Sequence, residues 1–297
     1  MKISKFAITD SDYKLLQELW RWKFLSTSII HHTIFEKRTL SACYKRLNRL
    51  EKARYIESFC SRDAKRWFWQ LTDKGYKALA FDDITVAQIG FRSEHRDHDL
   101  LVSLFHLGLW HSFKSPNNAI FTEQELRRID IKSYPDWTPQ TTQHRSDGYY
   151  KMDLQTSNDK SLVSIEVEFN LKAAPTYTEL GLFYSDILGI HQVLWLVKSE
   201  TDARFIQRNL AKDSSRKGSE HSFIILSHWL EHLWQTKILI GKDQGKNIEN
   251  LFVTMPSPSG GQIPAKVLFD FRKKLINSSI RRSQMESVIA HNKIIGC

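Results

Sequence analysis

Residues 147–169 read DGYYKMDLQTSNDKSLVSIEVEF, and this stretch decides how the larger part of the chain folds. Two runs that are typical of strands, 147–155 and 162–169, flank the turn-forming residues SNDKS, which predicts a β-hairpin. Side chains two residues apart share one face of a strand, so Glu166 and Glu168 point the same way. The hairpin therefore carries two acidic side chains on one face of its second strand.

Helices and apolar strands are expected on both sides of this hairpin, which predicts an α/β domain within an α+β chain. A Pro-, Thr- and Gln-rich surface loop is expected just before it. The expected helices are 97–113, capped by Asp97, then 122–129, 176–189 and 201–213, and the expected further strands are 192–198 and 221–227.

The excess positive charge of the chain is concentrated near its start. The 297 residues carry 43 Lys and Arg against 33 Asp and Glu, a net charge of +10, and residues 1–80 hold 17 of the former and 8 of the latter. Clustered Lys and Arg favour polyanions, because neutralising phosphates releases counterions. We therefore expect a nucleic-acid-binding module at the start, joined to a nearly neutral body.

Composition excludes several other classes of protein. With 41% hydrophobic and 26% charged residues the chain is expected to bury a core, and its three cysteines include no Cys-x-x-Cys pair that would suggest a zinc scaffold. No stretch approaches the roughly 20 apolar residues of a membrane helix, and the first residues lack the apolar core of a secretory signal. We expect a cytoplasmic protein with no membrane partner.

The first eighty residues have the element order of a winged helix. Helical spacing predicts helices over 12–25, 28–36 and 41–55, and two short strands over 55–60 and 66–72 follow with a basic tip between them. The third helix has the polar, cationic outer face of a helix that reads the major groove, and the hairpin is the wing. A small helical domain with a solvated basic face is the alternative. The candidate DNA-binding residues are Tyr44, Lys45, Arg46, Asn48, Arg49 and Lys52 on the third helix and Arg62, Lys65 and Arg66 at the tip.

The acidic residues of the hairpin predict a metal site. Asp147 lies at the start of the first strand and can approach Glu166 and Glu168, and three close carboxylates repel one another unless a cation lies between them. Mg²⁺ or Mn²⁺ prefers such oxygen ligands, polarises a phosphodiester and lowers the pKa of an attacking water. Lys172, four residues past Glu168, is placed to stabilise developing charge or to orient the nucleophile. The alternative is an ordinary Ser-Asp-Gly turn beside a half-exposed strand.

Asp147-Gly148, Glu166-x-Glu168 and Lys172 together resemble the PD-(D/E)XK active site of restriction-endonuclease-like proteins. The chain over residues 8–240 also resembles the replication-relaxation family, which includes the MobC-type relaxases of mobilisable plasmids. That resemblance is carried by the winged helix, by His98-Asp99-Leu100 and by Trp69-x-Leu71-Thr72-x-x-Gly75. It implies a strand-specific nick at the transfer origin of a plasmid or integrative element. Accessory mobilisation or coupling proteins are the partners that it implies beside double-stranded DNA.

The chain departs from the nuclease pattern at two positions. Ser146 precedes Asp147 where the pattern has Pro, and Glu168 stands where the commonest pattern has Lys, although an E-x-E version occurs among restriction-type nucleases. Glu123, on the short helix before the hairpin, resembles the additional acidic residue that such folds place near the metal. A relaxase can also hold DNA covalently through a tyrosine. Spacing assigns that role to none of Tyr149, Tyr150, Tyr177 and Tyr184.

These observations predict four segments. They are a winged-helix DNA-binding domain over 1–82, a linker over 83–96, a nuclease-like domain over 97–240, and a loop with a basic helical tail over 241–297. The predicted function is a Mg²⁺- or Mn²⁺-dependent DNA endonuclease that nicks at a specific site. The alternatives are a DNA-binding protein of replication or transcription control with an inactive nuclease fold, and a defence or transposition nuclease that makes double-strand breaks.

Overall fold

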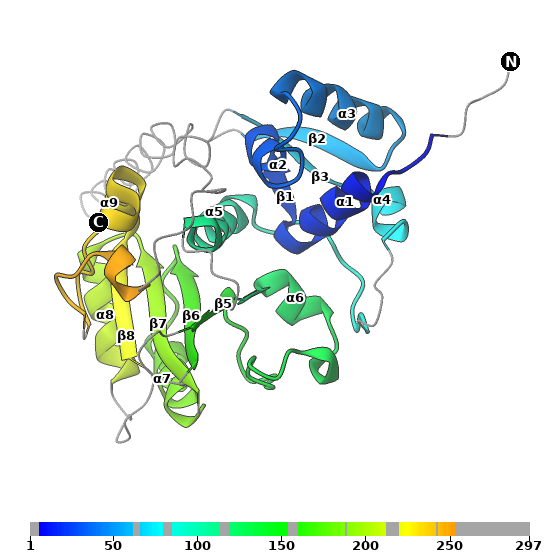
Figure 1. The fold of residues 1–297 in the computed structure, drawn as a ribbon. Helices are drawn as coiled ribbons and strands as arrows, with labels where there is room; N and C mark the ends of the chain where they lie inside the picture. Colours follow the sequence, from blue (N-terminus) through cyan, green and yellow to red (C-terminus); the bar gives the residue numbers. More distant parts are fainter. Residues whose placement is uncertain are drawn as a thin grey trace, which may run out of the picture.

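In a computed structural model of the chain, the described residues are 6–61, 66–79, 85–112, 119–153, 160–187, 189–211, 220–241 and 243–252. They form an α+β fold, as the sequence predicts (Figure 1). The wing-tip residues Arg62 and Lys65 and most of the tail expected over 241–297 lie outside this part of the chain.

The first unit combines short helices with a small antiparallel sheet whose strand order is β1-β3-β2. Side-chain hydroxyls cap α2 and α3, at Ser26 and Thr39 respectively. The elements are α1 (Asp10–Trp22), β1 (Phe24–Ser26), α2 (Thr27–Thr33), α3 (Leu40–Lys52), β2 (Ile56–Ser61), β3 (Arg66–Leu71) and α4 (Asp73–Lys77).

Helix α1 ends three residues earlier than the sequence predicts. Lys23 has a φ of 66°, which interrupts a right-handed helix. Phe24 and Leu25, expected to continue the helix, instead form β1 and pair with β3. The prediction of a helix to Leu25 was therefore wrong at its end, because pairing with a strand more than forty residues away overrides helical spacing.

The second unit is built on a mixed sheet of order β4-β5-β6-β7-β8 in the described residues. Strands β4, β5 and β6 run antiparallel to one another, whereas β6, β7 and β8 run parallel and are joined by helices. Its elements are α5 (Arg96–Ser112), β4 (Ala119–Thr122), α6 (Glu123–Arg128), η1 (Ile131–Ser133), β5 (Gly148–Asp153), β6 (Lys160–Glu168), α7 (Ala174–Asp186), β7 (Ile190–Val197), α8 (Glu200–Leu210), β8 (Glu220–Ile225), α9 (Leu226–His232), η2 (Leu233–Gln235) and η3 (Ile248–Leu251).

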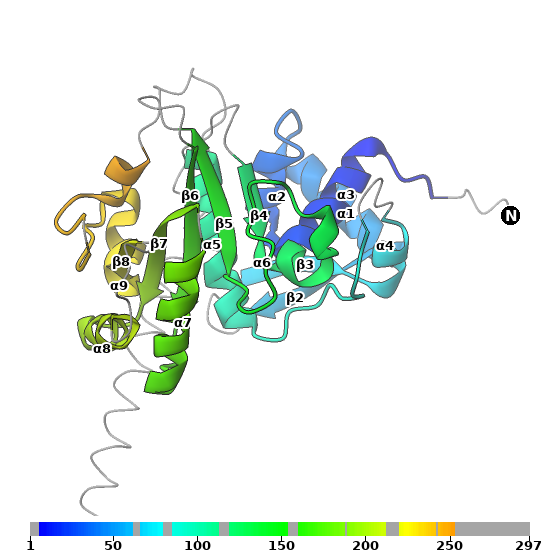
Figure 2. The same cartoon turned by 90° about the horizontal axis from the view of Figure 1, so that it is seen from below.

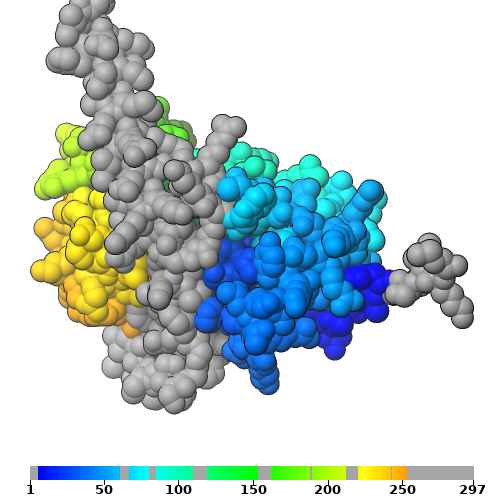
Figure 3. Space-filling view, turned by 90° about the horizontal axis from the view of Figure 1, so that it is seen from above, coloured from blue at the N-terminus to red at the C-terminus, as the bar shows by residue number. Residues whose placement is uncertain are grey.

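Helices cover both faces of this sheet. Helices α7 and α8 lie side by side on one face, where Tyr177 packs edge-on against Phe205 (Figure 2). Helices α5 and α9 lie on the other face, where Phe105 packs against Trp229 with ring centroids 5.1 Å apart. Seen from above, the first unit (blue) occupies one side of the molecule and the segment from β8 onward (yellow to orange) the other (Figure 3). The sheet is therefore buried on both faces, which explains its long apolar strands.

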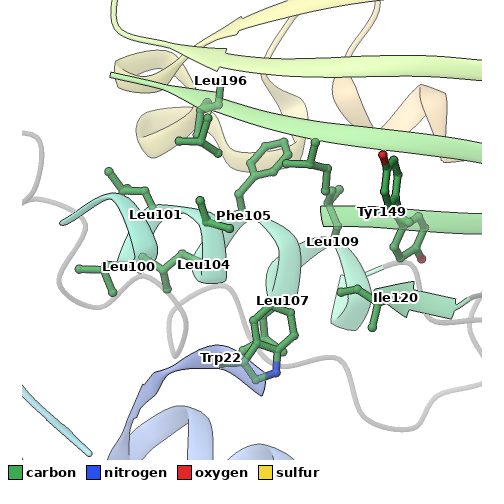
Figure 4. Packing of buried hydrophobic residues seen from close by; sticks show 14 of the residues in the cluster. Trp22, Leu100, Leu101, Leu104, Phe105, Leu107, Leu109, Ile120, Tyr149 and Leu196 are labelled. Carbon is green, nitrogen blue, oxygen red and sulfur yellow. The ribbon is translucent and has the colours of Figure 1, made fainter. Parts of the chain in front are cut away.

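Helix α5 lies between the sheet and the first unit. Its sequence, RDHDLLVSLFHLGLWHS, is apolar around most of its circumference, which is typical of a helix that is buried on more than one side. Figure 4 shows Phe105 directed toward Leu196 of the sheet, while Trp22 of α1 lies against the opposite side of the helix near Leu107. The Trp22 ring meets the ring of His106 edge-on, with centroids 5.8 Å apart. The two units therefore share one hydrophobic core.

The described part of the linker expected over 83–96 packs against α6. Val86 forms a β-bridge with Ile129, and the N–H of Ala87 donates to the carbonyl of Arg128 at 2.8 Å. In the described residues, no helix combines the length and the apolar character that crossing a bilayer requires.

We predict that Trp22→Ala lowers the free energy of unfolding by about 3–5 kcal/mol, because the change removes a large side chain from a core that both units share. Trp22 is 4% exposed, and Trp67→Ala, at 59% exposure, is the matched control. Denaturant unfolding followed by circular dichroism measures both variants. Equal midpoints for the two variants would show that the units do not depend on this contact.

Candidate functional site

One cleft contains all five residues that the sequence predicts as catalytic. Asp147 precedes β5, Glu166 and Glu168 lie near the end of β6, Glu123 begins α6, and Lys172 follows β6. All five line a cleft of about 900 Å³, bordered by α5, α6 and the segments after β6 and β7. Strands β6 and β7 run parallel, and the residues that follow them, Phe169, Asn170, Lys172, Lys198 and Ser199, line the cleft at their carboxyl ends.

Asp147 is held by the strand next to it. Its N–H donates to the carbonyl of Ile165 at 3.1 Å, and its Oδ2 accepts from the N–H of Val167 at 2.7 Å. A Cβ atom at Gly148 would lie 2.2 Å from the ring of His106, so only glycine fits at this position. The Asp-Gly pair thus lets the hairpin approach α5 closely while the carboxylate is fixed at the end of β6.

Glu166 is buried under α7, at 5% exposure. Its Oε1 accepts from Nε2 of His144 at 2.7 Å and from the hydroxyl of Tyr184. Burial disfavours the protonated form of His144, but contact with Glu166 outweighs this effect and raises the pKa of the imidazole. His144 and Tyr184 are therefore the hydrogen-bond partners of the Glu166 carboxylate inside the protein.

Glu168 holds the ammonium group of Lys172. The Nζ of Lys172 lies 2.9 Å from Oε2 of Glu168, and the Lys172 side chain is 48% exposed. Burial opposes the charge of Lys172, but its hydrogen bond to Glu168 outweighs this effect and raises the pKa of the ammonium group. The hydroxyl of Tyr177 accepts from the backbone N–H of Lys172 at 3.0 Å. This places a charged, solvent-accessible ammonium group at the rim of the cleft.

His98 is the cationic partner of Asp147. Its Nε2 lies 3.5 Å from Oδ2 of Asp147 and 3.0 Å from the carbonyl oxygen of Val167, and its Nδ1 lies 3.5 Å from Oδ1 of Asp99. Burial disfavours the imidazolium, but the two carboxylates outweigh it and raise the pKa of His98 to about 10. The sequence left two roles open for the His98-Asp99 step, capping and packing of its helix or support of the active site, and in the structure His98 contacts Asp147.

A lysine from the first unit also lines the cleft. The Nζ of Lys23 lies 2.8 Å from Oδ1 of Asp99 and 2.7 Å from Oε2 of Glu123. The second carboxylate oxygen of Glu123 lies 2.7 Å from the guanidinium of Arg127. Burial opposes the charge of Asp99, but its hydrogen bond with His98 and the nearby charge of Lys23 outweigh this effect and lower the pKa of Asp99 to about 2.

The cleft contains the type of ligand atom that a hard divalent cation prefers, because Asp147, Glu166 and Glu168 have carboxylate oxygens. In their described positions the three carboxylates are turned to His98, His144 and Lys172, respectively. Within the described ranges, no three His, Cys, Asp or Glu side chains are arranged as a metal-binding group. These contacts use one oxygen of each carboxylate, namely Oδ2 of Asp147, Oε1 of Glu166 and Oε2 of Glu168.

Basic side chains border the cleft around its acidic floor. They come from the linker, from α6, from the loop before β5 and from the carboxyl ends of β6 and β7. The lining cations with permanent charge, beside Lys23, are Arg92, Arg96, Arg127, Arg128, Arg145, Lys172 and Lys198. Glu94, Asp97 and Asp202 also line the cleft, so its border carries side chains of both charges.

The four tyrosines considered for covalent attachment are buried. Tyr149, Tyr150, Tyr177 and Tyr184 are each at most 1% exposed, and among the described residues no tyrosine lines the cleft. Burial raises the pKa of Tyr149, Tyr177 and Tyr184, which disfavours the phenolate that a nucleophile needs. In this arrangement, the hydroxyls of Tyr177 and Tyr184 serve as hydrogen-bond partners of the site.

Most of the candidate DNA-binding residues of α3 face solvent. Tyr44, Lys45, Arg49 and Lys52 are exposed, and Asn48 is half-buried. Of the three candidate residues at the tip, Arg66 is the one in the described part of the chain. It lies at the start of β3, and only its backbone is described.

Arg46 differs from these residues and is a correction to the expected outer face. Its guanidinium pairs with the fully buried Asp12 of α1 and donates to the carbonyl of Ala7 at 3.1 Å. Its side chain is 12% exposed. Arg46 therefore joins α3 to α1, and its charge is already compensated within the unit.

Sequence reasoning missed His144 and Lys23 as residues of the cleft. His144 lies in the loop expected at the surface, three residues before Asp147, and that proximity was the available signal. Lys23 gave no signal, because its partner Glu123 is 100 residues away. No family model, no curated protein and no solved structure matches the chain. Functional assignment therefore rests on the residues of the cleft and of α3.

We predict that Asp12→Asn lowers the free energy of unfolding at pH 7 by about 2 kcal/mol, because it weakens charged hydrogen bonds to Arg46. Although burial opposes ionisation, the bonds from Arg46 and Thr9 lower the pKa of Asp12 below its ordinary 3.8. The stabilisation is therefore complete above pH 4 and disappears as the pH falls through the lowered pKa.

Unfolding in urea from pH 7 to pH 2 measures this difference, with the exposed Asp10→Asn on the same helix as the control. A constant difference between wild type and Asp12→Asn over this range would contradict the assignment.

Proposed function

We propose that this chain is a metal-dependent DNA endonuclease whose first unit is a winged-helix DNA-binding domain. The observation that carries the proposal is the meeting of Asp147 with Glu166 and Glu168 at one cleft, beside the ammonium group of Lys172. The elements around these residues follow one another in the order α5-β4-α6-η1-β5-β6-α7-β7, with β4, β5 and β6 paired antiparallel to their neighbours and β7 parallel to β6. This order supports a restriction-endonuclease-like domain.

The element order of the first unit supports its proposed role. Helices α1, α2 and α3 precede the β2-β3 hairpin, and α3 exposes Tyr44, Lys45 and Arg49. A helix of this kind binds phosphates and base edges in the major groove. In this proposal, one DNA molecule contacts both α3 and the basic side chains of the cleft.

The residues of the cleft have separate roles in the proposed reaction. A Mg²⁺ or Mn²⁺ ion held by Asp147, Glu166 and Glu168 supplies Lewis acidity and a water of lowered pKa. Lys172 contacts the scissile phosphate and stabilises the charge that develops on its oxygens. The basic rim orients the DNA backbone, and His98 holds Asp147 in place through its ring.

The specific reaction, a nick in one strand at a transfer origin, comes from the family resemblance of the motifs. The same resemblance suggests accessory mobilisation or coupling proteins as partners. We also propose a cytoplasmic site of action, which is the expectation from the sequence composition. A nuclease that cuts both strands uses the same metal chemistry. The DNA products distinguish a nicking enzyme from an enzyme that cuts both strands.

A second candidate function is DNA binding without cleavage. The observation that favours it is the pairing of each proposed metal ligand with an internal cation, since carboxylates compensated in this way do not need a metal. The protein would then act on replication or transcription through its first unit alone.

We predict that the protein converts supercoiled plasmid to open circles in Mg²⁺ or Mn²⁺, and that Asp147→Asn and Glu166→Gln each abolish this conversion without changing duplex affinity. The reason is that each change removes a negative charge from the metal site. Asp97→Asn, another exposed carboxylate that lines the cleft, is the matched control.

Agarose gels and mobility-shift assays on the same DNA separate the candidates. Linear product would identify a nuclease that cuts both strands. Unbroken DNA that is nevertheless bound by the wild type would favour the second candidate, and cutting by the Asp147→Asn variant would end the catalytic assignment.

We predict that Lys45→Ala and Arg49→Ala each weaken duplex binding and lower the slope of log affinity against log salt by about 1, because each removes one phosphate contact. Arg204→Ala, an exposed arginine of α8 that pairs with Glu200, should leave the slope unchanged. Fluorescence anisotropy at several salt concentrations measures the slope. If all three variants keep the wild-type slope, α3 is not the DNA-binding helix.

A further inference from the structure

The first unit inserts a single lysine into the wall of the proposed nuclease cleft. Lys23 directly follows α1, and its side chain is only 11% exposed. Its ammonium group lies within 2.8 Å of two carboxylates, Asp99 on α5 and Glu123 on α6, and both are nearly buried. A cation from one unit thus bridges two helices of the other.

Both carboxylate partners of Lys23 are connected to Asp147 through further contacts. On one side, Asp99 lies 3.5 Å from Nδ1 of His98, and Nε2 of the same ring lies 3.5 Å from the Asp147 carboxylate. On the other side, the backbone N–H of Glu123 donates to the carbonyl of Asp147 at 3.2 Å. Lys23 is therefore connected to the side chain of Asp147 through His98 and to its backbone through α6.

The neighbours of Lys23 anchor it in this position. Arg21 lies 2.9 Å from Glu125 of α6, and the carbonyl of Arg21 accepts from the hydroxyl of Thr122 at 3.3 Å. Between them, Trp22 packs against α5. The tripeptide Arg21-Trp22-Lys23 is thus fixed on two helices of the second unit, and a change in the position of α1 moves Lys23 with it.

The placement of Lys23 is hard to explain by stability alone. Buried ion clusters contribute little net stability, because desolvating the charges opposes their attraction, whereas removing one partner leaves an uncompensated charge that drives rearrangement. Without Lys23, Asp99 and Glu123 face each other across the gap with only His98 and Arg127 to compensate them. His98 is then drawn from Asp147 toward Asp99.

We propose that Lys23 is a positioning residue for Asp147, through which docking of the DNA-binding unit sets the geometry of the cleft. This inference rests on the proposed function. It means that the cleft takes its described form only while α1 is docked, so that DNA binding by the first unit and phosphodiester cutting by the second are coupled through one side chain.

The test compares Lys23→Met with Lys14→Met, which removes the same charge from an exposed position of α1. Lys23→Arg keeps the charge and is the expected rescue. The first readout is amide hydrogen exchange at Val167, whose N–H donates to the Asp147 carboxylate. The second is Mn²⁺ affinity by calorimetry, and the third is plasmid cutting beside duplex affinity.

We expect Lys23→Met to lower Mn²⁺ affinity and the cutting rate by about 10- to 100-fold, as losses of residues that orient metal ligands do. Exchange at Val167 should become faster, and duplex affinity should stay unchanged. Lys14→Met should match the wild type in all readouts, and Lys23→Arg should recover most of the loss. If Lys23 only stabilised the fold, its loss would raise the exchange rates of all β6 amides alike, and that of Val167 would not rise more than the others.

Two outcomes separate this inference from the proposed function. If the wild type binds Mn²⁺ and cuts DNA but Lys23→Met does the same and Val167 exchanges as before, the inference about Lys23 is overturned and the function stands. If the wild type neither binds Mn²⁺ nor cuts DNA, the function fails, and the exchange of Val167 alone decides whether Lys23 positions Asp147.

A variant that folds despite the loss of Lys23 keeps the test decisive. Lys23→Met combined with Asp99→Asn and Glu123→Gln removes the uncompensated charges along with the lysine. If Lys23→Met does not fold, Lys23→Met combined with Glu123→Gln alone keeps Asp99 uncompensated and should exchange faster at Val167. The triple variant leaves no charge that draws His98 from Asp147, so it should exchange as the wild type does. Equal exchange at Val167 in these two variants would overturn the proposal.

Discussion

Burial of α5 on two sides is the constraint on which the rest of the structure depends. A helix that is apolar around most of its circumference cannot leave one face in water without a large cost in free energy, so the sheet covers one side and the first unit covers the other. Trp22 lies on the side away from Phe105, and both rings are nearly inaccessible. This arrangement brings the end of α1 to the start of α5, where the cleft begins.

Charge compensation is the second constraint, and it follows from the first. The helix that is buried for its apolar surface also carries His98 and Asp99 in its first turn, and these polar groups need partners inside the protein. Asp99 finds Lys23 from the docked unit, and His98 finds Asp147 from the hairpin. Ion pairs therefore stabilise the acidic cleft, and both units contribute side chains to these pairs.

The sequence predicts the parts of the fold that depend on local periodicity. The β5-β6 hairpin, helices α7 and α8 and strand β7 follow from alternation and helical spacing, and the common face of Glu166 and Glu168 follows from the period of two. Strands β1 and β4 are too short for a pattern, and they form because longer strands offer partners. The contacts of Arg46 with Asp12 and of Lys23 with Glu123 join residues 34 and 100 positions apart, and no local rule selects such pairs.

The departure of the chain from the commonest nuclease pattern has a structural counterpart in Lys172. That pattern has a Lys two residues after the acidic residue that corresponds to Glu166. This chain has Glu168 there, so the strand places a carboxylate in the cleft instead of an ammonium group. The carboxylate of Glu168 lies 2.9 Å from the ammonium group of Lys172, and the Lys172 side chain is 48% exposed. A positive charge is thus present beside Glu166 even though the strand itself supplies only acids. Asp147, Glu166 and Glu168 therefore lie in one cleft with the accessible ammonium group of Lys172, an arrangement that suits the proposed binding of a cation and a phosphodiester.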